Sequence, residues 1–408
     1  MREALIPVLL GADLNCYGMA RAFYEAYGVP SVAFGRQALG ATRHSRFLRS
    51  FAVPDLSDPR ICREVLLDFA KARSEKNLLL LACTDEYARI LIENKAALEP
   101  YYLLPCPNEN ALPLMEKDAF YRLCEAYGIP YPDTHIYRKI PTLSAVRSVG
   151  RRLSYPHIVK PSQSDLYWHH PFDGMEKVYL VHSAQEERGV LSRIYGAGYT
   201  GTVLAQRYIG GERARAFVLT LYFDREGSVA LRACGRALLE EMTPCGKGNY
   251  AALVTAPIPR VAVPLATMLT DIGYRGFANI DIRRDAKGRD FVLEINLRQG
   301  RSNYFLTAAG ANPAEILARD CVLGEDLGEE DVRREVLFRT VPLSVVCRYT
   351  ARDRDAALAR SLHRRGRDVS LLDTRADTFV NPLRSLYVWE HMRREKEKFR
   401  RYAERKRS

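Results

Sequence analysis

GFANIDIR at residues 276–283 and DFVLEINLR at residues 290–298 are the stretches of sequence that decide the fold. They predict two adjacent β-strands joined by a turn at residues 285–288. Because side chains alternate along a strand, Glu294 and Asn296 share one face, and Asp281 can point to the same side. Two acids and an amide oxygen form a hard, oxygen-only site that suits Mg²⁺. The alternative is a solvated polar face. The apolar neighbours of Glu294 disfavour it, since a buried carboxylate needs a partner.

Upstream of this hairpin, two lysines and one strand end appear in a definite order. Lys117 follows an apolar helix in a Lys-Asp pair, and Lys160 closes a predicted strand in the sequence Val-Lys-Pro. A later strand ends at Gln206-Arg207-Tyr208-Ile209, and Gly210-Gly211-Glu212 follows it. Each motif alone is common, but the five in this order are specific.

This set of motifs resembles the ATP-grasp superfamily over residues 115–320, with an acid followed by Glu-x-Asn-x-Arg as its final part. The resemblance implies ATP and Mg²⁺ as cofactors, with the cation on Asp281, Glu294 and Asn296. It also implies that Lys117 and Lys160 contact the ATP phosphates. The remaining expected nucleotide contacts are the strand end at Gln206, Tyr208 and Ile209 for adenine, and Glu212 for ribose.

The first hundred residues alternate short apolar strands with helical stretches, which predicts a parallel sheet covered on both faces. The expected fold is therefore α/β (α+β), an ATP-grasp fold with a Rossmann-like domain before it. The predicted boundaries are 1–114 for that domain, 115–328 for a largely antiparallel ATP-grasp domain, and 329–408 for a small C-terminal module. In this module a strand is expected at Val336–Val346 and a helix near Asp353–Arg364.

The N-terminal domain contributes candidate cleft residues at the ends of its strands. The first turn lacks a GxGxxG pattern, so a dinucleotide site is poorly supported. Ligands in such folds gather at the carboxyl ends of strands, which makes Gly11, Asn15 and the turn at residues 84–86 candidates. The alternative is that they are a tight-turn glycine and helix caps.

The segment from residue 162 to residue 177 departs from the ATP-grasp pattern, because it holds one glycine where the family usually has a glycine-rich loop. Ser162 and Lys177 are the expected contacts to phosphate in this loop. The adjacent His169 and His170 invite a metal interpretation, but neighbouring histidines on a loop rarely form a site alone. Surface or substrate-contacting roles are favoured for them.

Basic and polar residues directly after the hairpin are candidates for the chemistry. Arg298 can stabilise charge on a transferring phosphoryl group or an acyl phosphate, so it is predicted to be catalytic. Arg301 can hold a substrate carboxylate bidentately, and is predicted to serve both catalysis and binding. Ser302 and Asn303 can hold the remaining substrate oxygens. A plain surface arginine is the alternative for Arg301.

The segments 11–23 and 298–304 are similar to bacterial D-aspartate ligases. That resemblance implies an ATP- and Mg-dependent carboxylate–amine ligase that works through an acyl phosphate. It would join D-aspartate, or a similar amino acid, to an amine of a peptidoglycan precursor. The alternatives are another ATP-grasp ligase that makes a dipeptide or amino-acid conjugate, and a non-catalytic nucleotide-binding regulatory protein.

Composition limits the cellular compartment and the binding partners that are expected for this protein. Nine cysteines without a CxxC pair indicate reduced thiols, and no apolar run approaches the roughly 20 residues of a spanning helix, so a cytoplasmic protein is expected. The net charge is +12, and residues 389–408 hold nine Lys or Arg against four Glu. Expected partners are small-molecule or peptide substrates, with a second copy in a homodimer as a further candidate. No nucleic-acid module is present.

The basic C-terminal tail has helical spacing, with Trp389, Met392, Phe399 and Tyr402 expected on one face. Such a helix could touch an anionic membrane. The alternative is that its apolar face packs on its own domain.

Overall fold

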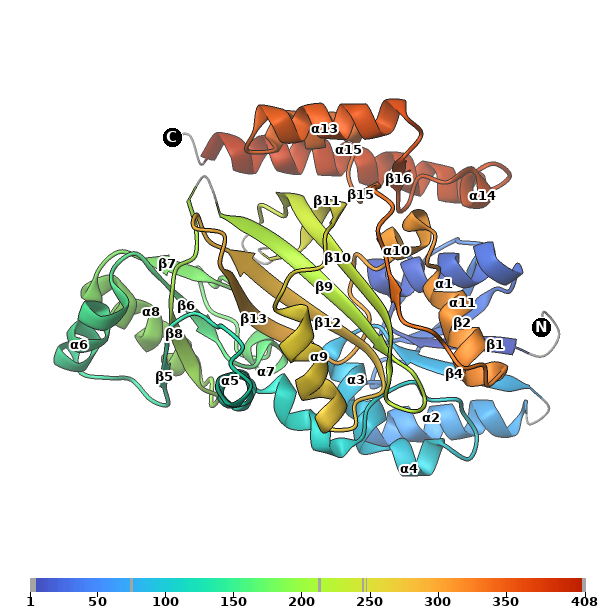
Figure 1. Cartoon of the computed structure of the whole chain (residues 1–408), viewed down its shortest axis with the longest axis horizontal. Helices are drawn as coiled ribbons and strands as arrows, with labels where there is room; N and C mark the ends of the chain where they lie inside the picture. The colour runs from blue at the N-terminus through green and yellow to red at the C-terminus, as the bar shows by residue number, and fades with distance from the viewer. Residues whose placement is uncertain (1–4, 74–75, 212–213, 244–245, 247, 406–408) are drawn as a thin grey trace.

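The computed structural model describes residues 5–73, 76–211, 214–243, 246 and 248–405. Glu212, expected at the ribose, lies outside these residues. Three sheets and their covering helices make up the molecule (Figure 1). Within the described part of the chain, every helix is too short or too polar to span a bilayer. The architecture confirms the expected α/β (α+β) class.

The N-terminal sheet is parallel, in the order β3-β2-β1-β4. The Asp13 carboxylate caps the first helix by accepting from the amides of Asn15 and Cys16, and Gly28 ends that helix in the left-handed conformation. Thr84 likewise caps the helix after the last strand of this sheet, so the cap predicted there is confirmed. The elements are β1 (Leu5–Leu10), α1 (Leu14–Tyr27), β2 (Ser31–Gly35), β3 (Leu48–Ala52), α2 (Pro59–Lys71), β4 (Asn77–Ala82), α3 (Asp85–Glu93) and α4 (Lys95–Leu98).

A small antiparallel sheet of order β5-β8-β6-β7 follows, with α6 and α8 on it (Figure 1). Its buried face is aliphatic and aromatic, whereas its strand ends carry the polar residues expected at the nucleotide. The elements of this part are η1 (Glu109–Met115), α5 (Lys117–Ala126), β5 (Thr134–Tyr137), α6 (Leu143–Leu153), β6 (His157–Pro161), α7 (Ser164–Trp168), β7 (Tyr179–Val181), α8 (Ala184–Gly196) and β8 (Val203–Arg207).

The largest sheet runs β13-β12-β9-β10-β11-β15-β16, with β14 on β10. Its neighbours from β13 to β15 pair antiparallel, as the sequence predicted for this region. The expected hairpin is confirmed, and its register sets Asp281 opposite Glu294 and Asn279 opposite Asn296. The elements are β9 (Arg215–Phe223), β10 (Val229–Glu240), β11 (Tyr250–Ala256), α9 (Ala262–Asp271), β12 (Gly276–Arg284), β13 (Asp290–Asn296), α10 (Tyr304–Ala309), α11 (Pro313–Leu317), η2 (Ala318–Val322), β14 (Glu330–Asp331), β15 (Leu337–Arg339) and β16 (Asp368–Ser370).

The C-terminal region is helical apart from the short strands β14–β16, which add to the large sheet. The strand expected at Val336–Val346 is largely wrong. Only β15 is extended, and Pro342 then starts α12 (Leu343–Tyr349), because proline lacks the amide of a sheet ladder and fits a helix start. The helix expected at Asp353–Arg364 is confirmed as α13. The short α14 (Arg375–Thr378) precedes the long α15 (Pro382–Arg405).

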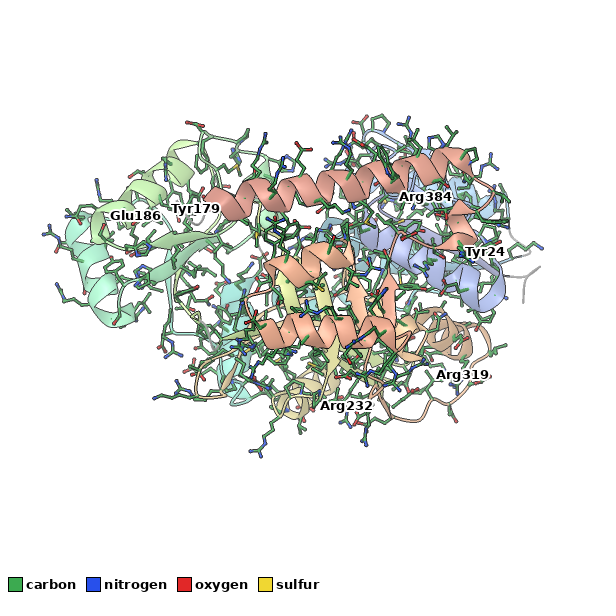
Figure 2. The ribbon with its side chains drawn as sticks, turned by 90° about the horizontal axis from the view of Figure 1, so that it is seen from above. Tyr24, Tyr179, Glu186, Arg232, Arg319 and Arg384 are labelled. Atoms are coloured by element: carbon green, nitrogen blue, oxygen red, sulfur yellow. The ribbon has the colours of Figure 1, made fainter. Side chains whose placement is uncertain are left out.

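The tail helix α15 lies across the upper surface of the molecule (Figure 2). Trp389 and Phe399 do not share one face of this helix as expected, because Phe399 is fully buried and Trp389 is 63% exposed. At about 100° per residue, Trp389 falls at the edge of the stripe that Met392 and Phe399 share. Met392 packs against the core, so the packing alternative describes the inner face.

Candidate active site

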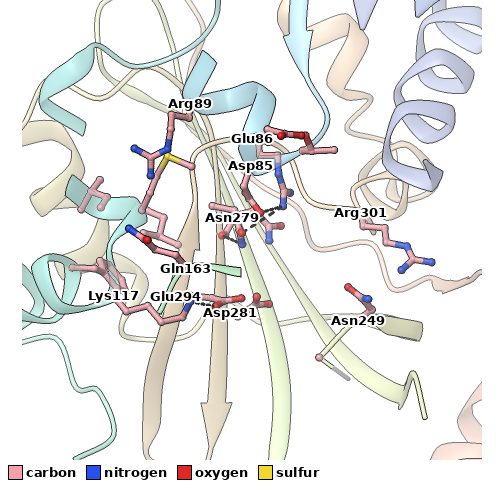
Figure 3. A pocket seen from close by; sticks show the side chains of 18 of the residues that line it. Asp85, Glu86, Arg89, Lys117, Gln163, Asn249, Asn279, Asp281, Glu294 and Arg301 are labelled. Atoms are coloured by element: carbon pink, nitrogen blue, oxygen red, sulfur yellow. Dashed lines mark hydrogen bonds and ion pairs between the residues drawn. The ribbon is translucent and has the colours of Figure 1, made fainter. Parts of the chain in front are cut away.

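A cavity of about 390 Å³ opens where the β12–β13 hairpin meets α3 of the N-terminal domain and α5 (Figure 3). The large sheet supplies Asp281 and Glu294, and the start of α3 supplies Asp85 and Glu86. Basic groups come from several elements and from the loop after β13. Its walls include most of the residues that the sequence singled out, namely Thr84, Asp85, Glu86, Lys117, Ser162, Lys177, Asp281, Glu294, Asn296, Arg298, Arg301 and Ser302.

Two of the three predicted metal ligands, Asp281 and Glu294, face each other across the hairpin and line this cavity with the third, Asn296 (Figure 3). The Tyr250 hydroxyl donates a hydrogen bond of 2.8 Å to Oδ1 of Asp281. Burial, followed by the nearby charge of Glu294, raises the pKa of Asp281 to about 7. Two acids held this close without a cation repel each other, so the pair is suited to a positively charged ligand.

Lysines supply the positive charge beside the acids. Nζ of Lys117 lies 3.2 Å from Oε2 of Glu294 and donates to the Ser162 carbonyl oxygen at 2.9 Å. Burial acts to raise the pKa of Glu294, but the lysines at 117, 177 and 160 outweigh it and hold that pKa well below its ordinary value. Burial and the charge of Lys117 lower the pKa of Lys160 to about 8. The positive charges of three lysines therefore act together on Glu294.

Arg298 links the hairpin to the N-terminal domain. Its Nη2 donates to Oδ2 of Asp85 at 2.8 Å, and its Nη1 donates to the Gln299 carbonyl oxygen at 2.9 Å. Nη2 also lies 3.5 Å from Oδ1 of Asn296. Its buried Nε has no hydrogen-bond partner among the described residues. The bonds of its two terminal nitrogens hold this guanidinium between the hairpin and the N-terminal domain.

Two of the three predicted substrate-binding residues line the cavity, and the third is buried in the protein. Arg301 and Ser302 line the cavity, and Figure 3 shows Arg301 on the side of Asn249, apart from the two acids. Asn303 is buried behind it, where its Oδ1 accepts from the Thr220 hydroxyl at 3.3 Å. The residues predicted to hold the cation and those predicted to hold the substrate carboxylate thus lie at different ends of one hollow.

A hydrogen-bonded junction ties the loop after β13 to the strand ends of the N-terminal domain. The Asn15 amide donates to the carbonyl oxygens of Cys83 at 2.9 Å and Gln299 at 3.0 Å, and Gln299 donates to the Ala82 carbonyl at 2.9 Å. Asn15 is 2% exposed, so it holds the cleft together from behind instead of lining it. Gly11 packs against Cys83 so closely that a side chain would collide there. The turn at residues 84–86 does line the cavity.

Not all predicted nucleotide residues reach this cavity. Among the described residues, its walls do not include Lys160, Gln206, Tyr208 or Ile209. Both bonds of the Gln206 amide nitrogen are internal, to the Tyr121 hydroxyl at 2.8 Å and Thr134 Oγ1 at 2.9 Å. That side chain therefore fixes the end of β8, whose backbone at Gln206 is paired with β5 and β6.

Sequence reasoning missed several residues that line the cavity, among them Arg89, Trp168, Tyr250 and Asn279. Asn279 could have been found, because it precedes Asp281 by two positions on one strand and shares its face. Tyr250 carries no local signal, since it comes from another strand. Trp168, and not the adjacent His169 or His170, borders the cavity.

The donor set fits a magnesium ion. No three His, Cys, Asp or Glu side chains gather as a metal site anywhere in the described ranges. Two carboxylates and an amide oxygen would therefore need further oxygens to complete the shell, and Mg²⁺ typically takes these from water and substrate phosphates.

No protein-family model matches the chain. It is 32% identical to the D-aspartate ligase of Enterococcus faecium (strain Aus0004) over 375 residues, which cover 90% of this chain and 89% of that protein. Its fold is similar to the ADP complex of N5-carboxyaminoimidazole ribonucleotide synthetase, with a TM-score of 0.59, 14% identity, and 96% and 98% of the two chains covered. The L-amino acid ligase from Bacillus licheniformis is similar at a TM-score of 0.56 and 14% identity, over 79% of this chain and 75% of that one. The chain belongs to the D-aspartate ligase-like carboxylate–amine ligases of the ATP-grasp superfamily, enzymes that form carbon–nitrogen bonds.

Proposed function

We propose that this ligase uses ATP and Mg²⁺ to activate a carboxylate of D-aspartate, or a close analogue, and joins it to an amine of a peptidoglycan precursor peptide. The observation that carries the proposal is the facing pair Asp281 and Glu294, set among lysines in one cavity with Arg298 and Arg301. The use of ATP would place the reaction in the cytoplasm.

The acid end of the cavity is assigned to the phosphates. Asp281, Glu294 and Asn296 would hold Mg²⁺, which when bound neutralises charge on the phosphate oxygens. Lys117 and Lys177 would hold phosphate oxygens as point charges, with Lys160 adding to the field. Lys117 is well placed for this, because its hydrogen bond to the Ser162 carbonyl fixes its position beside Glu294.

The arginine end is assigned to the amino acid. An oxygen of the substrate carboxylate would bond to the γ-phosphorus while the bond from that phosphorus to ADP breaks. The neutral acceptor amine then bonds to the acyl carbon, phosphate leaves with the former carboxylate oxygen, and the nitrogen gives up a proton. Arg298 would stabilise the negative charge on the transferring group. Arg301 and Ser302 would hold the second carboxylate of an aspartate-like acid, which needs a cation away from the phosphates.

A hydroxylamine trap tests the proposal, because an acyl phosphate reacts with hydroxylamine to give a hydroxamate. With ATP and magnesium, D-aspartate should give the largest hydroxamate yield in a panel of D- and L-amino acids. Arg301→Gln should raise KM for D-aspartate at least tenfold, the equivalent of about 1.4 kcal/mol. Arg289→Gln is the matched control, since Arg289 is an exposed turn residue paired with Asp285.

The outcomes separate the two halves of the proposal. Hydroxamate from a different amino acid would overturn the donor assignment while leaving acyl-phosphate chemistry intact. A dipeptide product with free amino acids as acceptors would overturn the peptidoglycan assignment. If none of the amino acids gives a hydroxamate in the presence of ATP, carboxylate activation itself is contradicted.

A further inference from the structure

An exposed ridge of large apolar side chains runs from the end of α14 into the first turns of α15. We call Phe379, Val380, Leu383, Leu386 and Trp389 the apolar ridge. Their exposed fractions are 85%, 72%, 58%, 61% and 63%, in that order. Isolated exposed apolar residues are ordinary, but contiguous ones mark contact surfaces. The ridge takes no part in the ligase site, whose cavity is lined by other residues.

The inner side of α15 is held firmly, so the ridge cannot turn inward. Arg384 is fully buried and its Nε lies 2.7 Å from Oδ2 of Asp377. Near the other end, Nζ of Lys398 lies 2.9 Å from Oε2 of Glu241, and Phe399 is fully buried. Both ends of the helix are therefore anchored, and its outward face is fixed toward solvent.

The outward face changes from apolar to basic along the helix. Between residues 393 and 401, the exposed positions hold five cations and one acid, Glu397. At about 3.6 residues per turn, these cations continue the stripe that Leu383 and Leu386 begin. A hollow of about 460 Å³ opens between α12 and this half of α15. The cations that line it are Arg348, Arg393, Lys396 and Arg400.

We propose that the apolar ridge and the basic half of α15 dock this enzyme on an anionic lipid surface. A helix lying in a membrane interface combines buried aromatic and aliphatic side chains with Lys and Arg that reach head-group phosphates. Clustered basic residues next to a membrane draw on its negative surface potential. Tryptophan and phenylalanine at the ridge suit the interface depth.

Charge favours a lipid surface over a second copy of the chain. A second copy would bring the same excess of positive charge toward α15, whereas phosphate head groups bring the opposite charge. Next to the ridge, Glu390 accepts from both Arg393 and Arg394, yet the exposed positions from 393 to 401 hold five cations against one acid, so this face keeps an excess of positive charge.

Co-sedimentation with large unilamellar vesicles tests the proposal on the full-length protein. One set of vesicles contains phosphatidylglycerol and phosphatidylcholine in equal parts, and the other contains phosphatidylcholine alone. The partition coefficient should be at least tenfold higher on the anionic vesicles and should fall as salt is added. Two double variants, Phe379→Ser with Trp389→Ser and Lys396→Gln with Arg400→Gln, should each lower it at least tenfold.

The matched control is Arg147→Gln with Arg151→Gln, which removes two exposed arginines from α6 at the far end of the molecule (Figure 1). It should leave vesicle binding unchanged. A wild-type protein that stays in the supernatant would overturn the proposal, as would a control that loses as much binding as the test variants. If the Phe379 and Trp389 changes instead lower the mass measured by light scattering and leave vesicle binding intact, a second copy covers the ridge.

Discussion

Replacing Glu294 by glutamine removes one negative charge from the acid pair while keeping the shape of the side chain. In the structure, Oε2 of Glu294 lies 3.2 Å from Nζ of Lys117 and opposite Asp281 in the hairpin. At an effective dielectric constant of about 20, the attraction to Lys117 amounts to about 5 kcal/mol, but glutamine also relieves the desolvation of a buried charge. The amide oxygen still accepts from Lys117, so the fold should lose only about 1–2 kcal/mol.

Catalysis should suffer far more than stability. Loss of one preorganised electrostatic group costs about 100- to 1,000-fold in kcat, or about 3–4 kcal/mol. The magnesium concentration for half-maximal rate should also rise at least tenfold, because one of only two carboxylates in the proposed ligand set is gone. Phosphate release is measured against magnesium concentration at saturating ATP and amino acid.

Asp290→Asn provides the control on the same strand. Asp290 accepts from Nε and Nη2 of Arg284 at 2.6 and 3.0 Å and does not border the cavity among the described residues. Its loss should leave kcat within about twofold, since partly exposed ion pairs contribute about 0–1 kcal/mol. A Glu294→Gln enzyme with kcat within about fivefold of the wild type, and an unchanged magnesium requirement, would refute the assignment.

Three further changes test the supporting structure. Asp85→Asn removes the charged partner of Arg298, so kcat should fall about tenfold with KM for ATP unchanged; unaltered kcat in steady-state kinetics would contradict the positioning role. Burial, then Lys398 and Arg301, lowers the pKa of His391 to about 4, so between pH about 6.5 and 4 the unfolded state binds a proton that the folded state does not. Stability should therefore fall by up to about 3 kcal/mol as pH decreases through that window, and urea unfolding of His391→Gln should lose this dependence. Asp377→Asn strips the fully buried Arg384 of its carboxylate and should cost about 3–5 kcal/mol; a loss below about 1 kcal/mol would show that the pair is not needed.

The sequence predicted those parts of the site that lie on one local element. Strand alternation set Glu294 beside Asn296, and the hairpin brought Asp281 opposite. Tyr250 could not be foreseen, because its contact with Asp281 depends on how β11 is placed relative to β12 within the sheet. The partner of Arg298 is Asp85, 213 positions earlier, and no local pattern specifies such a contact.

Burial of charge was equally hidden from the sequence. Arg384 lies shortly before the basic tail and, as an arginine, would be expected in solvent. It is fully buried, because Asp377 and the carbonyl oxygens of Gly40 and Arg43 accept its donors. The strand expected at Val336–Val346 failed for a local reason, since Pro342 ends the extended stretch. Apart from that strand, short-range rules worked within elements, and the errors arose where distant segments meet.

The junction of Asn15 with Gln299 has a consequence for anyone who wishes to redesign substrate choice. Hydrogen bonds hold the loop that carries Arg298, Arg301 and Ser302 to the strand ends of the N-terminal domain, which lie more than two hundred positions earlier in the chain. A chimaera that imports this loop from a relative without a residue equivalent to Asn15 or Gln299 would lose these hydrogen bonds and misplace both arginines. Grafts in this family should therefore be exchanged as pairs of distant segments.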